Sequence, residues 1–543
     1  MTHLSNVKLP ESDAVLDSAH IGDIRGALGT IRQGDTGVRI GLRAKLRTLL
    51  AILGPGLIVM VGDNDAGAFA TYTQAGQNYG TSLLWTLLLL VPVLYVNQEM
   101  VLRLGAVTGV GHARLIFARF GKFWGAFSVI DLFILNGLTI VTEFIGISLG
   151  LDYLGVPKLW GVGAAAVITM MAASTGDFRR FERFALLLCL GSLLLVPVLM
   201  AAHPSAGQIA HDFFIPGMPQ GGELADVMLL IIGIVGTTVA PWQLFFQQSY
   251  VIDKRITPAF IGYEKVDLWV GILVVIIGAV AMMAFCATAF TGTVDFGQFT
   301  DAGGIAAGLA KHVSPVAGTL FAVALIDASI IGAAAVSLST AYAIGDTLKV
   351  NHSLHRKAKD AKGFYLVYAG LILAAAGLVL MPHAPLGLVT EGVQSLAGVL
   401  LPSATVFLLL LCNDRAVLGP WVNGIWTNIF TGVVIAVLVT LSIVLTASVL
   451  FPEITGAQIL WILGGGAVLT VIVGGVALAT RTSDSGTVTV VGDRRTWRMP
   501  RLAHLPPAVM GRGTKIWMAV LRGYLVVATG LVIVRLVQLA IAG

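Results

Sequence analysis

The sequence predicts an all-α polytopic membrane protein. Of its 543 residues, 56% are hydrophobic and 12% are charged, which is about half the charged share of an average soluble domain. The mean hydropathy is +0.88. Apolar stretches of about 20 residues, the length of a membrane-spanning helix, recur along the chain. These stretches are continuous rather than alternating, which favours helices over a membrane barrel.

Twelve membrane spans are expected in chain order. They lie at roughly 46–78 (interrupted), 82–105, 123–152, 159–175, 184–202, 226–254 (interrupted), 266–292, 315–346, 363–382, 387–412, 424–450 and 457–479. A further apolar run at 516–541 contains two arginines. We predict a thirteenth span there, with an interfacial helix as the alternative.

The distribution of charge predicts the orientation of the spans. Residues 1–43 are polar and have no apolar core, which predicts a mobile cytoplasmic tail without a cleavable signal. Lysines and arginines gather before the first span, in every second loop after it, and in the segment 480–515, whereas the opposite loops are poor in them. By the positive-inside rule we expect a cytoplasmic N-terminus in a bacterial inner membrane. The net charge of +5 then needs no nucleic-acid partner.

Two of the expected spans are broken. Span one contains "GDNDAGA" at 62–68, and span six contains "GTTVAPW" at 236–242, where Pro241 removes a backbone donor. Broken spans five apart predict two inverted five-helix repeats, about 44–202 and 226–412, with a binding site between the breaks at the membrane midplane. Residues 413–479, which form spans eleven and twelve, and the C-terminal apolar helix 516–543 lie outside this core.

Acidic residues inside the spans are the first candidates for the site. A carboxylate in hydrocarbon costs at least a few kcal/mol, so Asp63 and Asp65 in the first break should face a hydrated cavity or a cation. Glu143 in span three and Asp327 in span eight are further intramembrane acids, functional by default. Other roles remain open: Asp65 can cap a helix, Asn64 can form a turn, and the other acids can be structural partners.

Features of soluble catalysts are missing from the sequence. It has no nucleotide-binding loop, no catalytic triad and no His/Cys cluster, and its three cysteines lie in separate apolar runs. We therefore expect neither an enzyme nor a cofactor. The small-residue stretch 464–475 permits close helix packing but leaves the oligomeric state open.

The broken spans resemble those of the Nramp metal-ion transporters. "GPGLIVMVGDNDAGAFATYTQAG" resembles their first span, which has Asp-Pro-Gly-Asn after Gly-Pro-Gly, and "TTVAPWQLFFQQS" resembles their sixth, usually Met-Pro-His-Asn. "TEFIGISLGL" resembles the third span, and "VQSLAGVLLPSATVFLLL" with "NDRAVLGPWVN" resembles spans ten and eleven. The likeness covers roughly residues 44–450. It implies the LeuT-type fold, with spans one to five and six to ten as inverted repeats.

The resemblance places a metal ligand in the first break. Asp65, nine residues after Gly56, falls on the metal-binding aspartate of the family. Ala68 replaces the family's metal-binding asparagine. Asn64 and Asp63 are the neighbouring groups that can compensate for this loss.

The remaining matches and departures lie in three other spans. Ala240 stands where the family has its metal-binding methionine, and Trp242 and Gln247 replace two histidines linked to proton movement. Glu143 and Gln394 match a glutamate of span three and a glutamine of span ten. These changes resemble one branch, the Nramp-related magnesium transporters, which is described as carrying magnesium, and also manganese, without proton coupling.

The substitutions favour a hard ion. A thioether favours transition metals, and its loss at Ala240 leaves only oxygen ligands. Magnesium dehydrates reluctantly, and a bound magnesium ion usually keeps several waters beside one or two carboxylates. A larger and wetter cavity therefore suits a magnesium ion. We expect Asp65 to supply the charge, and polar groups such as Thr238, Glu143 and Gln394 to hold the waters.

The energy for uptake need not come from protons. Without the histidines, the obvious groups that titrate near neutral pH are gone. An inside-negative potential of 100 mV gives a divalent ion about 4.6 kcal/mol, twice the single-charge value. The sequence therefore predicts a divalent-metal transporter that imports Mg²⁺, and also Mn²⁺, by alternating access.

Three alternatives remain open. The first is a proton-coupled importer of Mn²⁺ or other transition metals, working through Asp65 or Glu143. The second is a sodium-coupled carrier of organic cations or amino acids on the same fold, and the third is a receptor-like member that does not transport. An aspartate at the centre of the first break argues against an amino-acid carrier, although carriers of amines also use one.

Overall fold

The computed structural model describes residues 18–219, 221–382, 393, 402–451, 453–479, 494–506, 508, 518–521, 523–527, 530 and 534. The described residues are almost entirely helical, which confirms the predicted all-α polytopic class. Nine of the described helices are long and apolar enough to cross a membrane, or ten if the bent pair at the start of span one is counted as a single span.

The first five predicted spans correspond to nine α-helices. Their bounds are α1 (Leu42–Ile52), α2 (Pro55–Val61), α3 (Ala66–Tyr79), α4 (Trp85–Thr108), α5 (His112–Phe120), α6 (Lys122–Tyr153), α7 (Lys158–Ser174), α8 (Phe178–Gly191) and α9 (Leu195–Ala202), with the 3₁₀ turn η2 (Ser192–Leu194) joining α8 to α9. Helix α5 is short and amphipathic and connects two spans, whereas span one is divided into α1, α2 and α3.

The remaining spans follow in the same order. Their bounds are α10 (Ala206–Phe214), α11 (Leu224–Thr238), α12 (Pro241–Asp253), α13 (Ile261–Phe290), α14 (Ala302–His312), α15 (Pro315–Leu348), α16 (Lys362–Leu380), α18 (Arg415–Leu418), α19 (Ile425–Leu450) and α20 (Gly456–Ala479). The 3₁₀ turns are η1 (Ser18–His20), η3 (Pro258–Phe260), η4 (Ala358–Asp360), η5 (Gly419–Trp421) and η6 (Leu502–His504). A short apolar helix at Pro402–Cys412 is the described part of span ten.

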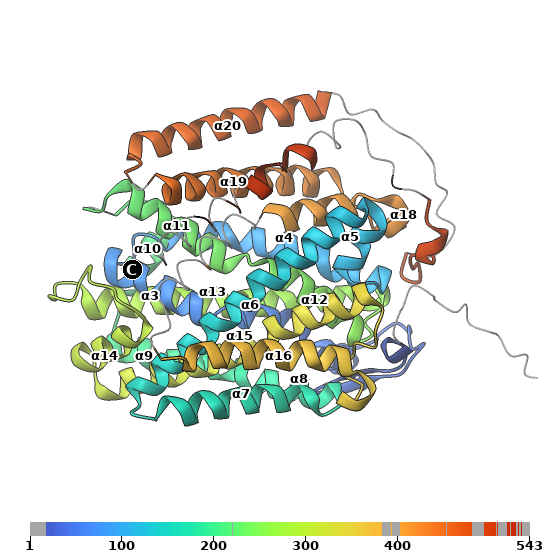
Figure 1. Cartoon of the computed structure of the whole chain (residues 1–543), viewed down its shortest axis with the longest axis horizontal. Coiled ribbons are helices and arrows are strands. Elements are labelled where there is room, and N and C mark those ends of the chain that lie inside the picture. Colours follow the sequence, from blue (N-terminus) through green and yellow to red (C-terminus); the bar gives the residue numbers. More distant parts are fainter. Residues whose placement is uncertain are drawn as a thin grey trace, which may run out of the picture.

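Three long helices form the centre of the bundle. Helix α15 packs along α6, and α13 packs along α2 and α3. Helices α7 and α16 cover one side, and α19 and α20 pack on each other at the opposite side (Figure 1). The two broken spans, α1–α3 and α11–α12, therefore lie inside the bundle, against the long helices.

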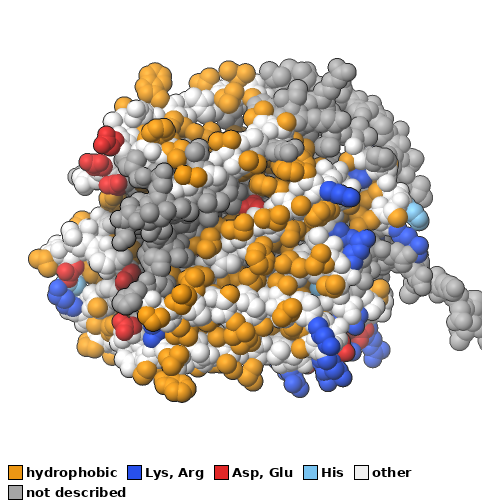
Figure 2. All heavy atoms as spheres, in the orientation of Figure 1, with side chains coloured by type: hydrophobic (Ala, Val, Ile, Leu, Met, Phe, Trp, Pro, Cys, Tyr) orange, Lys and Arg blue, Asp and Glu red, His pale blue; other side chains and the backbone are white. Residues whose placement is uncertain are grey.

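The surface separates into an apolar belt and two charged ends. Large side chains such as Leu187, Leu273 and Ile277 are more than half exposed on the belt, as expected for lipid-facing helices. Lysines and arginines gather at one end in Figure 2 and most acidic residues at the other. The basic end comprises the loops around 177–183, 253–255 and 355–362. The acidic end comprises the loops around 203–226 and 291–301.

The N-terminal segment differs from the prediction of a mobile tail. Residues Ile24–Gly26 (β1) and Gly29–Ile31 (β2) form an antiparallel hairpin, with Ile24 paired to Ile31. Both isoleucines are buried, and the hairpin packs against α1. The prediction is therefore wrong for this part of the tail, because the hairpin buries its apolar residues against the core instead of leaving them in solvent.

Candidate functional site

The first break lies between the end of α2 at Val61 and the start of α3 at Ala66. Asp65 caps α3, and its Oδ1 accepts the backbone N–H of Ala68 at 3.0 Å. Glu143, from the middle of α6, accepts the N–H of Ala66 through Oε2 at 3.1 Å. The positive end of α3 therefore holds two carboxyl groups, as its orphan N–H groups and its dipole favour.

The second break lies between α11 and α12. Helix α11 ends at Thr238, and Pro241 occupies the first turn of α12, where its missing N–H costs nothing. Ala240 is the extended residue before it, with φ −87° and ψ 141°, and makes no side-chain cap. This break therefore presents the negative, carbonyl-rich end of α11 beside a side chain that is only a methyl group.

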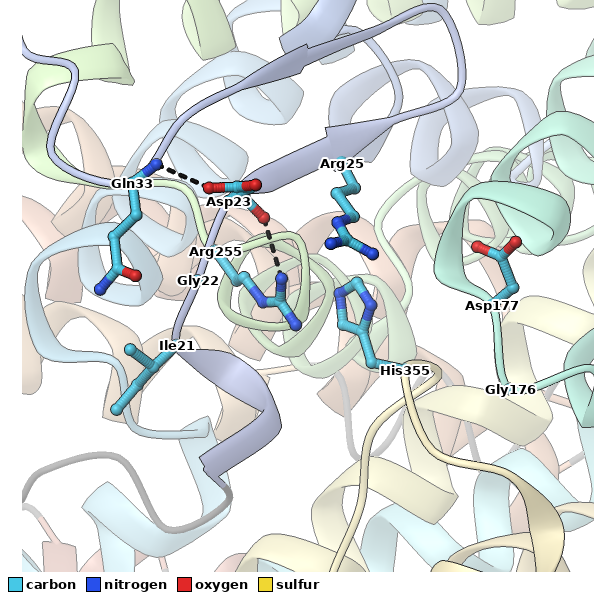
Figure 3. Close-up of a pocket in the computed structure, with 9 residues that line it drawn as sticks. All are labelled: Ile21, Gly22, Asp23, Arg25, Gln33, Gly176, Asp177, Arg255 and His355. Atoms are coloured by element: carbon cyan, nitrogen blue, oxygen red, sulfur yellow. Dashed lines mark hydrogen bonds between the residues drawn. The ribbon is translucent and has the colours of Figure 1, made fainter.

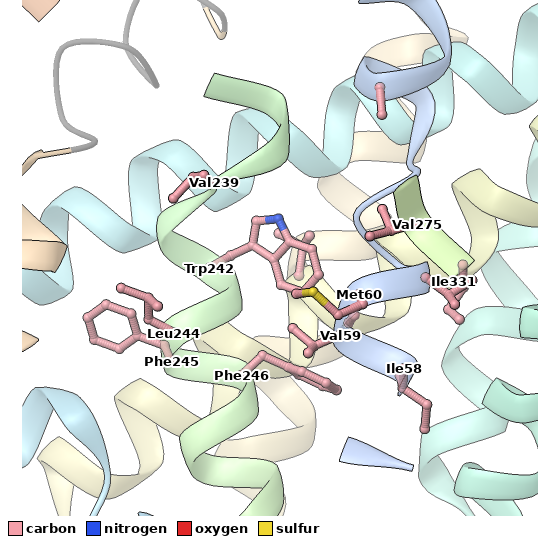
Figure 4. Packing of buried hydrophobic residues seen from close by; sticks show 14 of the residues in the cluster. Ile58, Val59, Met60, Val239, Trp242, Leu244, Phe245, Phe246, Val275 and Ile331 are labelled. Carbon is pink, nitrogen blue, oxygen red and sulfur yellow. The ribbon is translucent and has the colours of Figure 1, made fainter. Parts of the chain in front are cut away.

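The two breaks meet in the interior. Gln243, in the first turn of α12, donates to the Asp63 carboxylate. Tyr72 of α3 and Thr238 of α11 share a hydrogen bond of 2.7 Å between their hydroxyl groups. The Trp242 side chain lies beside Met60 and Val59 of α2 (Figure 4). The prediction of two adjacent interrupted spans is thereby confirmed.

The acidic side chains of the site are buried, whereas one face of α3 beside them is partly exposed. Asp63 and Glu143 are fully buried, and Asp65 is 6% exposed. One face of α3, formed by Gly67, Ala70 and Gln74, keeps partial exposure along its length. The far end of α3 contacts the acidic end of the molecule through Gln77 and the loop at Asp295, so this face runs from the break toward that end.

Three buried oxygen atoms at the first break have no hydrogen-bond partner in the described structure. They are Asp63 Oδ2, Asn64 Oδ1 and Glu143 Oε1. Buried polar atoms are nearly always hydrogen-bonded, so these three acceptors, two in the break and one on α6 beside it, are available to water or to another partner.

The remaining predicted residues lie apart from this pair of carboxyl groups or outside the described residues. Asn64 points its amide nitrogen toward α13, donating to the Val275 carbonyl at 3.2 Å. Asp327 lies on α15 with its carboxyl group packed against Gly191 of α8, and no described contact joins it to Asp65. Gln394 is outside the described residues, so its role in the site stays a prediction.

The number of side-chain ligands is low. Among the described residues, no three His, Cys, Asp or Glu side chains converge as a metal site. A cation at the breaks would therefore be held by one or two carboxylates, with carbonyl oxygens and water supplying the rest. The described cavities of the chain lie toward the basic end, so the roomy chamber expected from the sequence stays a prediction.

Gln243, which joins the two breaks, was not among the residues expected from the sequence. Gln243 is 1% exposed, and its Oε1 accepts the side-chain N–H of Gln98 at 3.0 Å. An amide inside an apolar span is a recognisable signal, because such a group needs a buried partner. The two proposed histidine replacements are both buried, Trp242 in apolar packing and Gln247 with neither amide atom hydrogen-bonded in the described structure.

Comparisons with known proteins give a consistent result. The family model described as Nramp, natural resistance-associated macrophage protein-like, matches residues 56–448. A divalent metal cation transporter MntH of Ralstonia nicotianae is 30% identical over 402 residues, which are 70% of this chain and 87% of that protein. MntH of Bacillus subtilis is 25% identical over 421 residues, 74% of this chain and 92% of that protein.

A solved structure supports the fold. The crystal structure of the Eremococcus coleocola manganese transporter, in complex with an aromatic bis-isothiourea substituted compound, matches with a TM-score of 0.63 at 19% identity. The match covers 82% of this chain and 97% of that chain. The predicted LeuT-type fold is thereby confirmed.

Proposed function

The chain belongs to the Nramp family, and from this premise we propose that it is a divalent metal-ion transporter that imports Mg²⁺, and also Mn²⁺, by alternating access without proton coupling. Its relatives are named as metal cation transporters rather than enzymes. The finer assignment, to the magnesium-transporting branch of the family, rests on the chemistry of the two breaks.

One observation carries the proposal. Two helix interruptions meet in the buried interior, where Asp65 and Glu143 share the N-terminus of α3. Two neighbouring carboxylates in an apolar interior repel each other unless a cation or a proton accompanies them. Unpaired acceptors on Asp63, Asn64 and Glu143 provide further oxygen atoms for the ion or its water.

The choice of ion follows from the ligand types. The described polar side chains in the breaks and hydrogen-bonded to them are carboxylates, amides and hydroxyl groups, and the methyl group of Ala240 offers no ligand. Oxygen ligands suit hard cations such as Mg²⁺, whereas a thioether or thiolate would favour softer transition metals. Magnesium also tolerates a site with one or two carboxylates, since it keeps several of its waters.

The direction of transport is argued from charge. The partly exposed face of α3 leads from the break toward the acidic end, where a cation would be attracted from solution. The basic end would face the cytoplasm of a bacterial cell by the positive-inside rule. The ion would then move down the membrane potential, with the N-terminus cytoplasmic.

The second candidate is a proton-coupled Mn²⁺ importer. It is favoured by the position of the Asp65 and Glu143 carboxyl groups at the same helix N-terminus, since such a pair can exchange one proton for a cation. The relatives are named as divalent metal or manganese transporters, which suits this candidate as well. A sodium-coupled organic-cation or amino-acid carrier is a third candidate, and Asp65 at the first break argues against an amino-acid substrate.

Purified protein in liposomes separates these candidates. We expect an inside-negative potential to drive Mg²⁺ and Mn²⁺ uptake while a pH dye inside the vesicles reports no acidification. Proton entry in fixed ratio to the metal would replace the uncoupled proposal with the second candidate. Absence of metal flux, with sodium-dependent uptake of an organic cation, would replace both.

A further inference from the structure

We propose that Lys254, Glu182 and Asp267 form a charge clamp that closes the ion pathway at the basic end, and that the hairpin β1–β2 locks this clamp. The clamp lies away from the two breaks that hold the ion. It is inferred from contacts at a second bend in span one, and its test requires no transported ion.

The clamp grips the bend between α1 and α2. The two helices meet at an angle of 52°, and Gly54 in the bend has φ +153°, a conformation that other residues rarely adopt. The Lys254 ammonium group, at the end of α12, donates to the carbonyl oxygens of Ile52 at 2.6 Å and Leu53 at 2.8 Å. A cation therefore satisfies the carbonyl end of α1, where the helix dipole favours positive charge.

The other side of the bend receives the opposite charge. Asp267 of α13 accepts the N–H of Gly56 at 2.6 Å and that of Leu57 at 3.3 Å. It therefore caps the positive end of α2 from a different span. Glu182 of α8 completes the clamp through an ion pair of 2.6 Å with Lys254. Span one is thus held at this bend by α8, α12 and α13 together.

The clamp is buried between the first break and the basic end, where the ion pathway is closed. The side chains of Lys254, Glu182 and Asp267 are fully buried, and so are Val59, Phe246 and other residues between the break and the basic end. Among the described helices, separation of α1 and α2 from α8 and α12 opens a route from the break to the basic end. Separating them breaks the contacts of the clamp.

The closed clamp also contains a destabilising group. Glu264 is fully buried next to the clamp, and neither of its carboxylate oxygens has a hydrogen-bond partner in the described structure. A buried polar group without a partner costs free energy. This cost offsets part of the stabilisation by the ion pair, so the closed state can still open during a transport cycle.

Hydrogen bonds from several residues attach the hairpin and the segment before it to the clamp region, including bonds from Arg179 and Arg183 of α8 to hairpin carbonyl groups. The backbone N–H of Ala27 donates to Glu182 Oε2 at 2.5 Å, whereas Lys254 contacts the other carboxylate oxygen, Oε1. Arg255, the residue after Lys254, donates to the carbonyl oxygens of Ala19 and Asp23 at 2.9 Å each. Figure 3 shows the bond between Arg255 and Asp23 at the edge of a cavity of about 600 Å³.

The hairpin also covers α1. The main packing contacts of α1 are with α13 and with the two hairpin strands. Gly29 approaches Ala51 so closely that an added Cβ would lie 2.9 Å from the Ala51 methyl group. Helix α1 cannot swing away from α13 while the hairpin is docked, so undocking of the hairpin must accompany opening.

Cysteine labelling in detergent tests the clamp. The background is a cysteine-free chain in which Cys189, Cys286 and Cys412 are replaced by alanine, and the reporter is Val59→Cys, below the break. We expect Arg255→Gln to loosen the docking of the hairpin. The double variant Lys254→Met/Glu182→Met should remove the two partners of the ion pair together and leave Asp267 on its two backbone donors. Each should raise the labelling rate of the reporter by a water-soluble thiol reagent at least about tenfold, which corresponds to about 1.4 kcal/mol.

Two controls distinguish opening of the clamp from a general loosening of the fold. Lys45→Gln removes a charge from the exposed face of α1, where no described contact holds it, and should leave the labelling rate unchanged. A second reporter, Ala70→Cys, lies on the acidic side of the break and should label no faster in any variant. Unchanged labelling at Val59→Cys in Arg255→Gln, or equal increases at both reporters, would overturn the proposal, whether or not the double variant folds.

Discussion

Replacing Asp65 with asparagine should separate ion binding from folding. Asp65 does two things in the structure: it carries a negative charge at the break, and it caps α3 by accepting the Ala68 N–H at 3.0 Å. Asparagine and aspartate are about equally good helix caps. The variant Asp65→Asn should therefore keep the cap, and with it the fold, while it removes the charge that the proposed ion requires.

The size of the expected loss follows from the burial of the carboxylate. Two unit charges 4 Å apart interact by about 4 kcal/mol at an effective dielectric constant of 20, so a carboxylate and a divalent ion gain roughly 8 kcal/mol before desolvation is subtracted. Removing one partner of a buried charge pair costs about 2–5 kcal/mol net. The dissociation constant should therefore rise by a factor between about 30 and about 5,000.

Isothermal titration calorimetry with Mg²⁺ and Mn²⁺ measures this effect directly. The matched control is Asp301→Asn, since Asp301 caps α14 by accepting the Gly304 N–H at 2.8 Å, far from the breaks in an acidic-end loop. Asp65→Ala should bind as weakly as Asp65→Asn and in addition lose about 1 kcal/mol of stability with the cap. If Asp65→Asn bound both ions within about threefold of the wild type, the ion would not be held by Asp65 and the proposed site would be refuted.

Three further substitutions test the other parts of the site. Ala240→Met should shift the ratio of Mn²⁺ to Mg²⁺ uptake about tenfold or more toward manganese, because a thioether is a soft ligand; an unchanged ratio in liposome flux would contradict the argument from ligand softness. Glu143→Gln keeps a hydrogen-bond acceptor for the α3 terminus but lowers the charge, so calorimetry should show weaker ion binding at nearly unchanged melting temperature; wild-type affinity would exclude Glu143 from the site. Gln243→Met should lower the unfolding free energy by about 1–3 kcal/mol, since it leaves the buried Asp63 carboxylate without its donor. The matched control Gln247→Met removes an amide that has no described partner and should be neutral or stabilising, and equal losses in the two variants would mean that the Asp63 contact contributes nothing.

The position of the breaks could be predicted from the sequence because each has a local chemical cause. Pro241 cannot donate a backbone hydrogen bond, and acidic residues in "GDNDAGA" cannot remain in a continuous lipid-facing helix. The meeting of the breaks followed from their spacing of five spans. The residues that break a helix and the order of the helices can both be read from a single sequence. The structure confirms the two breaks and their contact.

The direction in which individual side chains point could not be predicted in the same way. Asp63, Asn64 and Asp65 are consecutive, yet one faces α12, one faces α13 and one caps α3. In a non-helical break no periodicity relates neighbouring residues, so the sequence gives no rule for their orientation. Asp327 shows the same limit, since its isolation in an apolar helix did not reveal that it packs against α8.

The charges at the basic end were misinterpreted for a different reason. Lys254 and Glu182 stand next to arginines in the sequence, and the basic residues of such segments served only to predict the orientation of the spans. The structure instead buries both side chains completely, 2.6 Å apart. Burial of a charge depends on a partner from another part of the chain, here 72 residues away, and a count of local charges cannot detect such a partner.

The two ends of α2 connect these observations. This helix has seven residues, Pro55–Val61, and therefore spans only about 10 Å at 1.5 Å per residue. One end is capped by Asp267 within the clamp, and the other leads directly into the break at Asp63 and Asp65. A short helix moves as one body, so an ion that draws the break together must also change the strain on the clamp.

Thermodynamic linkage makes that coupling reciprocal. If metal binding at Asp65 favours the closed clamp, the factor by which the metal slows labelling at Val59→Cys equals the ratio of its affinities for the closed and the open states. Arg255→Gln raises the population of the open state, so it must weaken metal binding once that state is well populated, and by no more than this ratio. Titration and labelling on the same variant measure both quantities. A variant in which labelling reports a mainly open clamp, but in which metal affinity is unaltered and the metal still slows labelling, would mean that the hairpin and the ion act on different conformational changes, and that α2 does not transmit between them.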